Sequence, residues 1–88
     1  MSAQNERAGT LVVLTRPECE LCERMLHELS ALGRRHPLPP VELRDVDSDP
    51  ELQRRYGLKI PVLLVDGVPV CSVRLDAPEL LRLLRPNA

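Results

Sequence analysis

The sequence predicts one α/β domain with the element order β-α-β-α-β-β-α and a four-stranded mixed sheet of strand order 2-1-3-4. Three observations support this prediction: an apolar, β-branched run near the N-terminus, a helical repeat directly after it, and two apolar runs that flank an Asp-Gly pair. The chain has 88 residues, which suffice for one domain with one core.

The first strand is expected at residues 10–15, TLVVLT, because this run is β-branched and almost wholly apolar. Such runs are typical of strands buried on both faces of a sheet, so we place it at the centre. A helix is expected over residues 20–32, since apolar residues recur there at helical spacing and Gly33 stands where a helix could end. These apolar residues are Cys22, Met25, Leu26, Leu29 and Leu32.

Residues 34–40, RRHPLPP, contain three prolines, which exclude the interior of a helix or a sheet. They lead to residues 41–46, VELRDV, whose apolar residues are spaced as in a strand. Because strand-helix-strand connections are right-handed and join parallel strands, this second strand should lie parallel to the first.

A short helix is expected over residues 50–56, PELQRRY. Ser48 or Asp49 can cap its N-terminus, Pro50 suits its first turn, and Gly57 can end it.

The third and fourth strands are predicted in KIPVLLVDGVPV, residues 59–70, where Asp66-Gly67 is a strong signal for a hairpin. The hairpin should be antiparallel and should add to the other side of the first strand. A closing helix follows in DAPELLRLL, residues 76–84, with Asp76 as N-cap and Glu79 as its capping-box partner. Its apolar face should consist of Leu80, Leu81 and Leu84.

Composition argues against several classes of function. Tyr56 is the only aromatic residue and the net charge is −1, so neither base stacking nor phosphate binding is favoured, and we expect no nucleic-acid partner. Residues 1–9 are polar, which predicts a flexible tail without a targeting signal before a domain at residues 10–85. No apolar run reaches the ~20 residues of a membrane span. We therefore expect a cytoplasmic monomer that does not bind membranes.

The stretch RPECELC, residues 16–22, contains the two cysteines that are the candidate reactive groups. Cys19 falls in the turn between the central strand and the first helix, where free backbone N–H groups and the helix dipole favour a thiolate. Cys22 lies one turn further on the apolar face of that helix, within disulfide reach. Cys19 is therefore expected to be the nucleophile and Cys22 the resolving cysteine. Nearby glutamates disfavour a thiolate on Cys19, and nearby arginines favour it.

A second candidate element is KIP, residues 59–61, at the start of the third strand. Pro61 is a candidate for a cis peptide bond, which would turn the backbone of Ile60 towards the dithiol. The N–H and C=O of Ile60 could then hold a substrate strand. Lys59 could attract an acidic substrate group, and Arg16 could contact the thiolate or a substrate carboxylate.

With TRPECELC, YGLKIPVLLVDG and DAPELLRLL in this order, the chain resembles the glutaredoxin-like proteins of the thioredoxin superfamily. It is most similar to the small bacterial glutaredoxin-like family once filed as a domain of unknown function. The resemblance implies the three-layer fold of that superfamily and a thiol-disulfide oxidoreductase active in cell redox homeostasis. It assigns the nucleophile to Cys19, the resolving role to Cys22 and the cis-proline to Pro61. Arg16 stands where glutaredoxins often have a Lys.

Two departures limit what the resemblance implies. Glutaredoxins typically have Cys-Pro-Tyr-Cys, whereas Glu20 and Leu21 separate the cysteines here, and their Gly-Gly pair corresponds to Cys71-Ser72. No cofactor is implied, and glutathione remains a candidate reductant or co-substrate. The substrate should be a protein or small-molecule disulfide.

Other interpretations of the cysteines stay open. The same scaffold could be a non-catalytic binding or adaptor module whose thiols hold zinc or an iron–sulfur cluster, or its dithiol could be vestigial. We expect no bound metal. Cys71 is expected to be a small apolar core residue, with a third redox thiol as the alternative.

Overall fold

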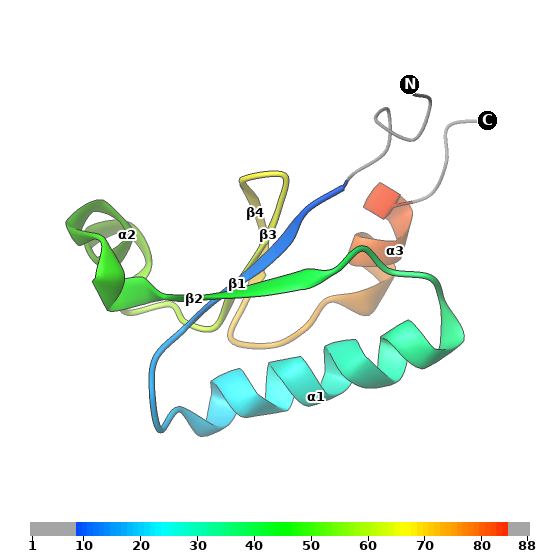
Figure 1. Cartoon of the computed structure of the whole chain (residues 1–88), viewed down its shortest axis with the longest axis horizontal. Helices are drawn as coiled ribbons and strands as arrows, with labels where there is room; N and C mark the ends of the chain where they lie inside the picture. The colour runs from blue at the N-terminus through cyan, green and yellow to red at the C-terminus, as the bar shows by residue number, and fades with distance from the viewer. Residues whose placement is uncertain (1–8, 85–88) are drawn as a thin grey trace.

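The computed structural model describes residues 9–84. The elements follow in the predicted order (Figure 1). They are β1 (Leu11–Thr15), α1 (Glu20–Arg35), β2 (Val41–Asp45), the 3₁₀ turn η2 (Val46–Ser48), α2 (Pro50–Tyr56), β3 (Val62–Val65), β4 (Val68–Ser72) and α3 (Ala77–Leu84). The tail predicted at residues 1–9 lies outside the described residues except for Gly9.

The sheet has the predicted strand order, β2-β1-β3-β4. β1 pairs with β2 in parallel and with β3 antiparallel, and β3 pairs with β4 antiparallel. The hairpin turns at Asp66 and Gly67, which both have positive φ values, 51° and 84°, as a two-residue hairpin turn requires. β1 is therefore the central strand that its apolar sequence predicted.

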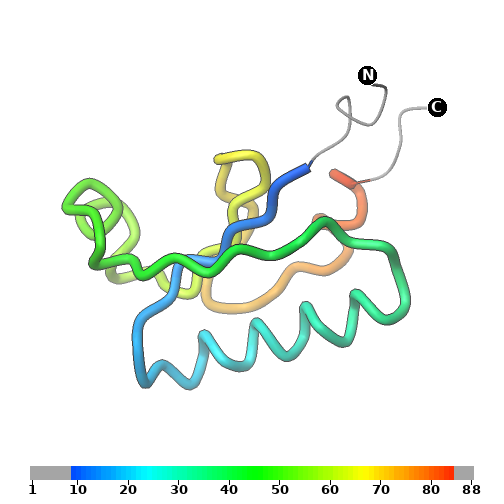
Figure 2. Tube along the Cα trace, in the orientation of Figure 1, coloured from blue at the N-terminus to red at the C-terminus, as the bar shows by residue number. Residues whose placement is uncertain are grey.

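Alternating side chains of β1 face two separate core clusters. Leu11 and Val13 face α1 and α3, whereas Val12 and Leu14 face the side that carries α2. Figure 2 follows this arrangement along the chain, with α2 and α3 at opposite ends of the sheet. The three-layer architecture follows, with the sheet between helices on both faces.

The end of α1 differs from the prediction. The helix continues through Gly33 and includes Arg34 and Arg35, so Gly33 is not a cap and the predicted linker is shorter. His36, with φ −139° and ψ 139°, is extended, and its N–H donates to the Leu32 carbonyl at 2.9 Å. The physical reason is Pro37, which disfavours helical geometry in the residue before it, His36. The helix therefore ends at Arg35.

The second strand, in contrast, ends one residue earlier than predicted. Val46 is fully buried but belongs to η2, because the Asp45 side chain accepts a hydrogen bond from the Asp47 N–H at 2.8 Å and starts a turn there. Asp49 is the N-cap of α2, accepting from the Glu51 N–H at 2.8 Å.

The N-terminus of α3 has only half of the predicted capping box. The Asp76 side chain accepts from the Glu79 N–H at 3.1 Å, as predicted. The Glu79 carboxylate, however, binds Arg82, at 3.0 and 2.6 Å, while the Asp76 N–H donates to Cys71 Sγ at 3.5 Å. An ion pair one helical turn away thus replaces the reciprocal bond.

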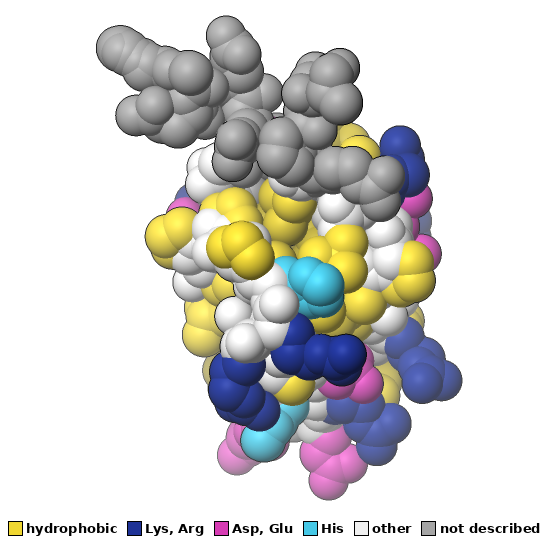
Figure 3. Space-filling view, turned by 90° about the vertical axis from the view of Figure 1, so that its right-hand side faces the viewer, with side chains coloured by type: hydrophobic (Ala, Val, Ile, Leu, Met, Phe, Trp, Pro, Cys, Tyr) yellow, Lys and Arg dark blue, Asp and Glu magenta, His cyan; other side chains and the backbone are white. Residues whose placement is uncertain are grey.

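The face over α3 and the end of α1 is shown in Figure 3, where apolar side chains gather in the centre with basic side chains beneath them. A groove of about 330 Å³ lies between these helices, lined by Glu28, Ala31, Leu32, Arg35, Leu75 and Ala77. None of the helices within residues 9–84 is long and apolar enough to cross a membrane.

Candidate active site

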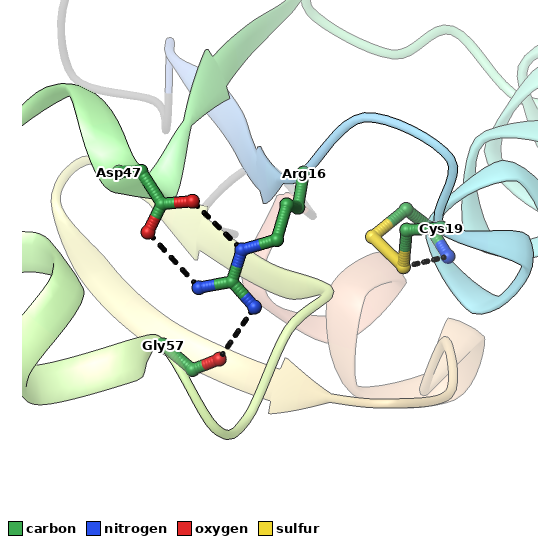
Figure 4. Close-up of a disulfide and its surroundings, with 5 residues drawn as sticks. Arg16, Cys19, Asp47 and Gly57 are labelled. Carbon is green, nitrogen blue, oxygen red and sulfur yellow. Dashed lines mark hydrogen bonds and ion pairs between the residues drawn. A yellow bond between two sulfur atoms is a disulfide. The ribbon is translucent and has the colours of Figure 1, made fainter.

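Cys19 and Cys22 form a disulfide at the N-terminus of α1, with their Cα atoms 5.2 Å apart (Figure 4). Cys19 is the N-cap residue and has an extended backbone, with φ −111° and ψ 107°. Its Sγ accepts a hydrogen bond from the Cys22 N–H at 3.2 Å. A sulfur thus occupies the place that a serine or aspartate oxygen takes in ordinary helix caps.

The two sulfurs differ in exposure. Cys22 is 2% exposed and lies on the apolar face of α1 with Met25 and Leu29, whereas Cys19 is partly exposed. An external thiol or disulfide can therefore approach Cys19 much more easily than Cys22. The burial of Cys22 is a direct result of the helical spacing seen in the sequence.

Two residues beside the site have unusual backbone conformations. Glu18, directly before Cys19, has φ 59°, and Val73, directly after β4, has φ 70°. The Val73 N–H donates to the Pro61 carbonyl at 2.7 Å, and the Arg74 N–H donates to Ser72 at 2.7 Å. Positive φ is rare for Glu and strongly disfavoured for β-branched Val, so nothing in the sequence indicated either conformation.

The Ile60–Pro61 peptide bond is cis. Because Val62 pairs with Leu14, Pro61 lies beside Thr15, at the end of β1 from which the cysteine loop begins. Among residues 9–84 no hydrogen bond engages the N–H or C=O of Ile60. Lys59 is exposed, and its N–H donates to the Tyr56 carbonyl at 2.8 Å.

Arg16 has partners that the sequence analysis did not identify. Its Nε donates to Asp47 Oδ2 at 2.8 Å, its Nη2 to Asp47 Oδ1 at 3.0 Å, and its Nη1 to the Gly57 carbonyl at 3.2 Å. Gln53 Nε2 adds a bond to Asp47 Oδ1 at 3.0 Å. Figure 4 shows the guanidinium pointing towards Asp47 and Gly57 and not at the disulfide.

The hydrogen bonds between Arg16 and Asp47 change the protonation of both groups. They hold the pKa of the Asp47 carboxyl below its ordinary value, with a smaller contribution from Gln53, and they raise the pKa of Arg16. Both groups are therefore charged at neutral pH, and Asp47 neutralises much of the field of Arg16.

One sequence signal could have located Asp47. Thr15 pairs with Asp45 in the parallel ladder, and the carboxyl ends of adjacent parallel strands lie at the same edge of a sheet. Polar residues just after the two strands, Arg16 and Asp47, were therefore candidates for a contact. Gly57 had no comparable signal, because it contributes only a carbonyl group.

Three further residues are of types that can take part in redox or metal chemistry: Cys71, His27 and His36. Cys71 is a free, half-buried thiol that packs beside the α1–α3 core cluster, and burial raises its pKa. His27 and His36 are exposed. Within residues 9–84 there is no group of three or more His, Cys, Asp or Glu residues arranged to hold a metal ion.

Comparison with known proteins places the chain in a family. The family model described as glutaredoxin-like domain (DUF836) matches residues 10–85. The chain belongs to this glutaredoxin-like family. No curated protein matches it.

Two solved structures are similar to this glutaredoxin-like protein. A Nitrosomonas europaea protein solved by NMR is 31% identical with a TM-score of 0.77, covering 86% of this chain and 91% of that one. A thioredoxin variant from Halobacterium salinarum is 20% identical with a TM-score of 0.57, covering 97% of this chain and 82% of that one. The second likeness shows the thioredoxin fold alone. The glutaredoxin-like family and the Cys19–Cys22 disulfide are together consistent with a redox function.

Proposed function

We propose that this glutaredoxin-like protein is a thiol-disulfide oxidoreductase that reduces disulfides or mixed disulfides with Cys19 and Cys22. The observation that carries the proposal is the asymmetric disulfide at the start of α1, with Cys19 partly exposed and Cys22 buried. Helix N-termini lower the pKa of cysteines, and the thiolate is the attacking species in thiol–disulfide exchange.

In the proposed reaction the Cys19 thiolate attacks one sulfur of the substrate disulfide. A mixed disulfide with Cys19 forms, and the other substrate sulfur leaves as a thiolate that takes up a proton. The Cys22 thiolate then attacks Cys19 Sγ, closes the Cys19–Cys22 disulfide and releases the second substrate thiol. Two electrons have passed from the protein to the substrate, and an external thiol such as glutathione restores the dithiol.

The geometry around Ile60 supports a place for the substrate chain. Its backbone N–H and C=O make no hydrogen bond within the described residues. Pro61 lies beside the end of β1 from which the cysteine loop starts. An extended substrate can pair with this backbone as an added strand does, with its disulfide over Cys19. Exposed Lys59 favours an acidic group on the substrate. We expect a monomer acting in the cytoplasm, where reducing thiols regenerate it.

The test is equilibration of the protein in a graded series of glutathione redox buffers, followed by acid quench, alkylation and intact-mass measurement. The proposal expects Cys19 and Cys22 to pass reversibly between dithiol and disulfide while Cys71 stays a thiol. A persistent glutathione adduct on Cys19 would indicate monothiol chemistry instead. If both thiols stay unmodified across the series, the proposal is wrong.

Single substitutions separate the two roles. Cys19→Ser should abolish turnover of a disulfide substrate, whereas Cys22→Ser should accumulate the mixed disulfide on Cys19. Equal behaviour of the two variants would contradict the assigned roles. Metal analysis of freshly purified protein belongs with this experiment, because stoichiometric zinc or a coloured cluster would favour a metal-binding module.

A further inference from the structure

We propose that Arg16 is a positioning residue, which fixes the loop that carries Cys19 against the loop that carries Ile60 and Pro61 by binding Asp47 and Gly57 together. The consequence is that Arg16 sets the position of Cys19 relative to the Ile60 backbone, where the substrate chain is proposed to bind, without itself binding the substrate. The proposal rests on the proposed function, since it concerns the same site.

The contacts join three connections of the fold. Arg16 lies three residues before Cys19, Asp47 lies in η2 between β2 and α2, and Gly57 begins the connection from α2 to β3. The hydrogen bonds from Arg16 span 31 residues to Asp47 and 41 residues to Gly57. One guanidinium thus links the loop that leads to Cys19 with the connections before and after α2, and the three linked residues lie on the same side of the disulfide (Figure 4).

Only an arginine can make this set of bonds. Its planar fork donates to both oxygens of Asp47 through Nε and Nη2 while Nη1 reaches the Gly57 carbonyl. A lysine would provide a single ammonium group without this fixed geometry. Because the ion pair is bidentate and belongs to a network with Gln53, it differs from ordinary surface ion pairs, which contribute little to the stability of the fold.

The space around Gly57 shows how closely Arg16 and the end of α2 approach this residue. A Cβ added there would lie 2.5 Å from the Gln53 carbonyl oxygen and 3.4 Å from Arg16 Nη2. The first contact is with backbone, so it cannot be relieved by rotating a side chain. The close fit requires glycine at the position whose carbonyl accepts from Arg16.

Asp47→Asn and Arg16→Gln together distinguish positioning from direct substrate binding. Both substitutions weaken the link between the loops, but Asp47→Asn leaves the positive charge of Arg16 in place and freer. If Arg16 positions the loops, the two variants should have the same defect. If Arg16 binds a substrate carboxylate, Asp47→Asn should preserve or improve the reaction with an acidic substrate, while Arg16→Gln impairs it.

The experiment measures two quantities on the full-length protein. The first is amide hydrogen exchange of the oxidised protein in residues 16–22 and 57–61, compared with β1 and β3. The second is the rate of mixed-disulfide formation in the Cys22→Ser background, with two peptide disulfides that carry either a carboxylate or an amide beside the cysteine. Alkylation of Cys19 by iodoacetamide, a small neutral reagent, reports its intrinsic reactivity.

Arg16→Gln and Asp47→Asn should both accelerate exchange in the two loop segments and leave β1 and β3 unchanged. Both should slow mixed-disulfide formation by about ten- to a hundredfold with either peptide, because misplaced groups cost rate on this scale. The rate of Cys19 alkylation should stay close to that of the parent. Arg16→Lys should form the mixed disulfide almost as slowly as Arg16→Gln. The matched control is Arg82→Gln, which breaks a two-contact ion pair with Glu79 inside α3 and joins no loops.

Two results would overturn the proposal. One is unchanged exchange in residues 57–61 in both variants, which would show that the link does not hold that loop, whatever the activity. The other is a rate for the acidic peptide that falls in Arg16→Gln but not in Asp47→Asn, since that would assign Arg16 to substrate binding. If the parent protein forms no mixed disulfide at all, the proposed function fails, and the exchange measurement still decides whether Arg16 holds the loops.

Discussion

The hydrogen bond from the Cys22 N–H to Cys19 Sγ, 3.2 Å long, makes a quantitative prediction about the thiolate. Substitution Cys22→Pro removes this N–H, whereas Cys22→Ala keeps it, and both remove the second thiol of the pair. In a Cys71→Ser background Cys19 is then the last thiol in the chain, which has three cysteines. The difference between the two variants therefore isolates the effect of one backbone N–H on Cys19.

The expected magnitude follows from the energy of such a bond. A hydrogen bond to a charged group contributes about 1.5–3 kcal/mol, and about 1.4 kcal/mol corresponds to one pH unit in an ionisation midpoint. The Cys19 thiol should therefore ionise roughly one to two pH units higher in the Pro variant than in the Ala variant. The dipole of α1 acts in both variants and cancels from the comparison.

The assay is a pH titration of the ultraviolet absorbance of the thiolate, with circular dichroism to verify the fold. Proline is tolerated in the first turn of a helix, although it restricts the residue before it. Glu20→Pro, placed in the Cys22→Ala background, is the matched control, because it puts a proline in the same turn and the extended Cys19 can precede it. The reasoning is refuted if Cys22→Pro and Cys22→Ala titrate together, or if Glu20→Pro raises the midpoint equally.

Three further predictions concern Gly57, Asp47 and Cys71. Gly57→Ala should lower the free energy of unfolding by about 1–3 kcal/mol, measured by urea denaturation, because the new Cβ overlaps a backbone oxygen, and an unchanged midpoint would contradict the close fit. The pKa of Asp47 is lowered in the folded state, so its contribution to stability is present above its unfolded value near pH 4 and disappears as the pH falls through the folded value. The parent should therefore lose its stability advantage over Asp47→Asn in that acidic range, and a gap that persists in acid would argue against the ion pair. Burial raises the pKa of Cys71, so in the reduced protein iodoacetamide should modify Cys71 more slowly than Cys19 at neutral pH, and mass spectrometry of the alkylated peptides measures both rates.

Most of the fold could be predicted because its signals are local. The apolar run of β1, the helical spacing after Cys19 and the Asp66-Gly67 turn each specify one element within a few residues. Right-handed crossover then leaves few ways to arrange the strands, and the order β2-β1-β3-β4 was among them. The errors were at element ends, where Pro37 outweighs Gly33 and where the Asp45 side chain starts a turn.

The dithiol itself was visible in the sequence for the same reason. The spacing of Cys19 and Cys22 and their place between a strand and a helix are short-range facts, and the burial of Cys22 follows from helical periodicity. The sequence by itself therefore determined the fold class, the position of the disulfide and the difference in exposure between its two sulfurs.

Only the tertiary structure decided what surrounds the disulfide. The partners of Arg16 lie 31 and 41 residues away, and its pairing with Asp47 depends on the parallel register of β1 and β2. The positive φ values of Glu18 and Val73 likewise belong to residues that would not choose them locally. The ion pair of Arg16 and the strained backbone of these two residues depend on contacts between distant segments. Such contacts exist only once the sheet has assembled.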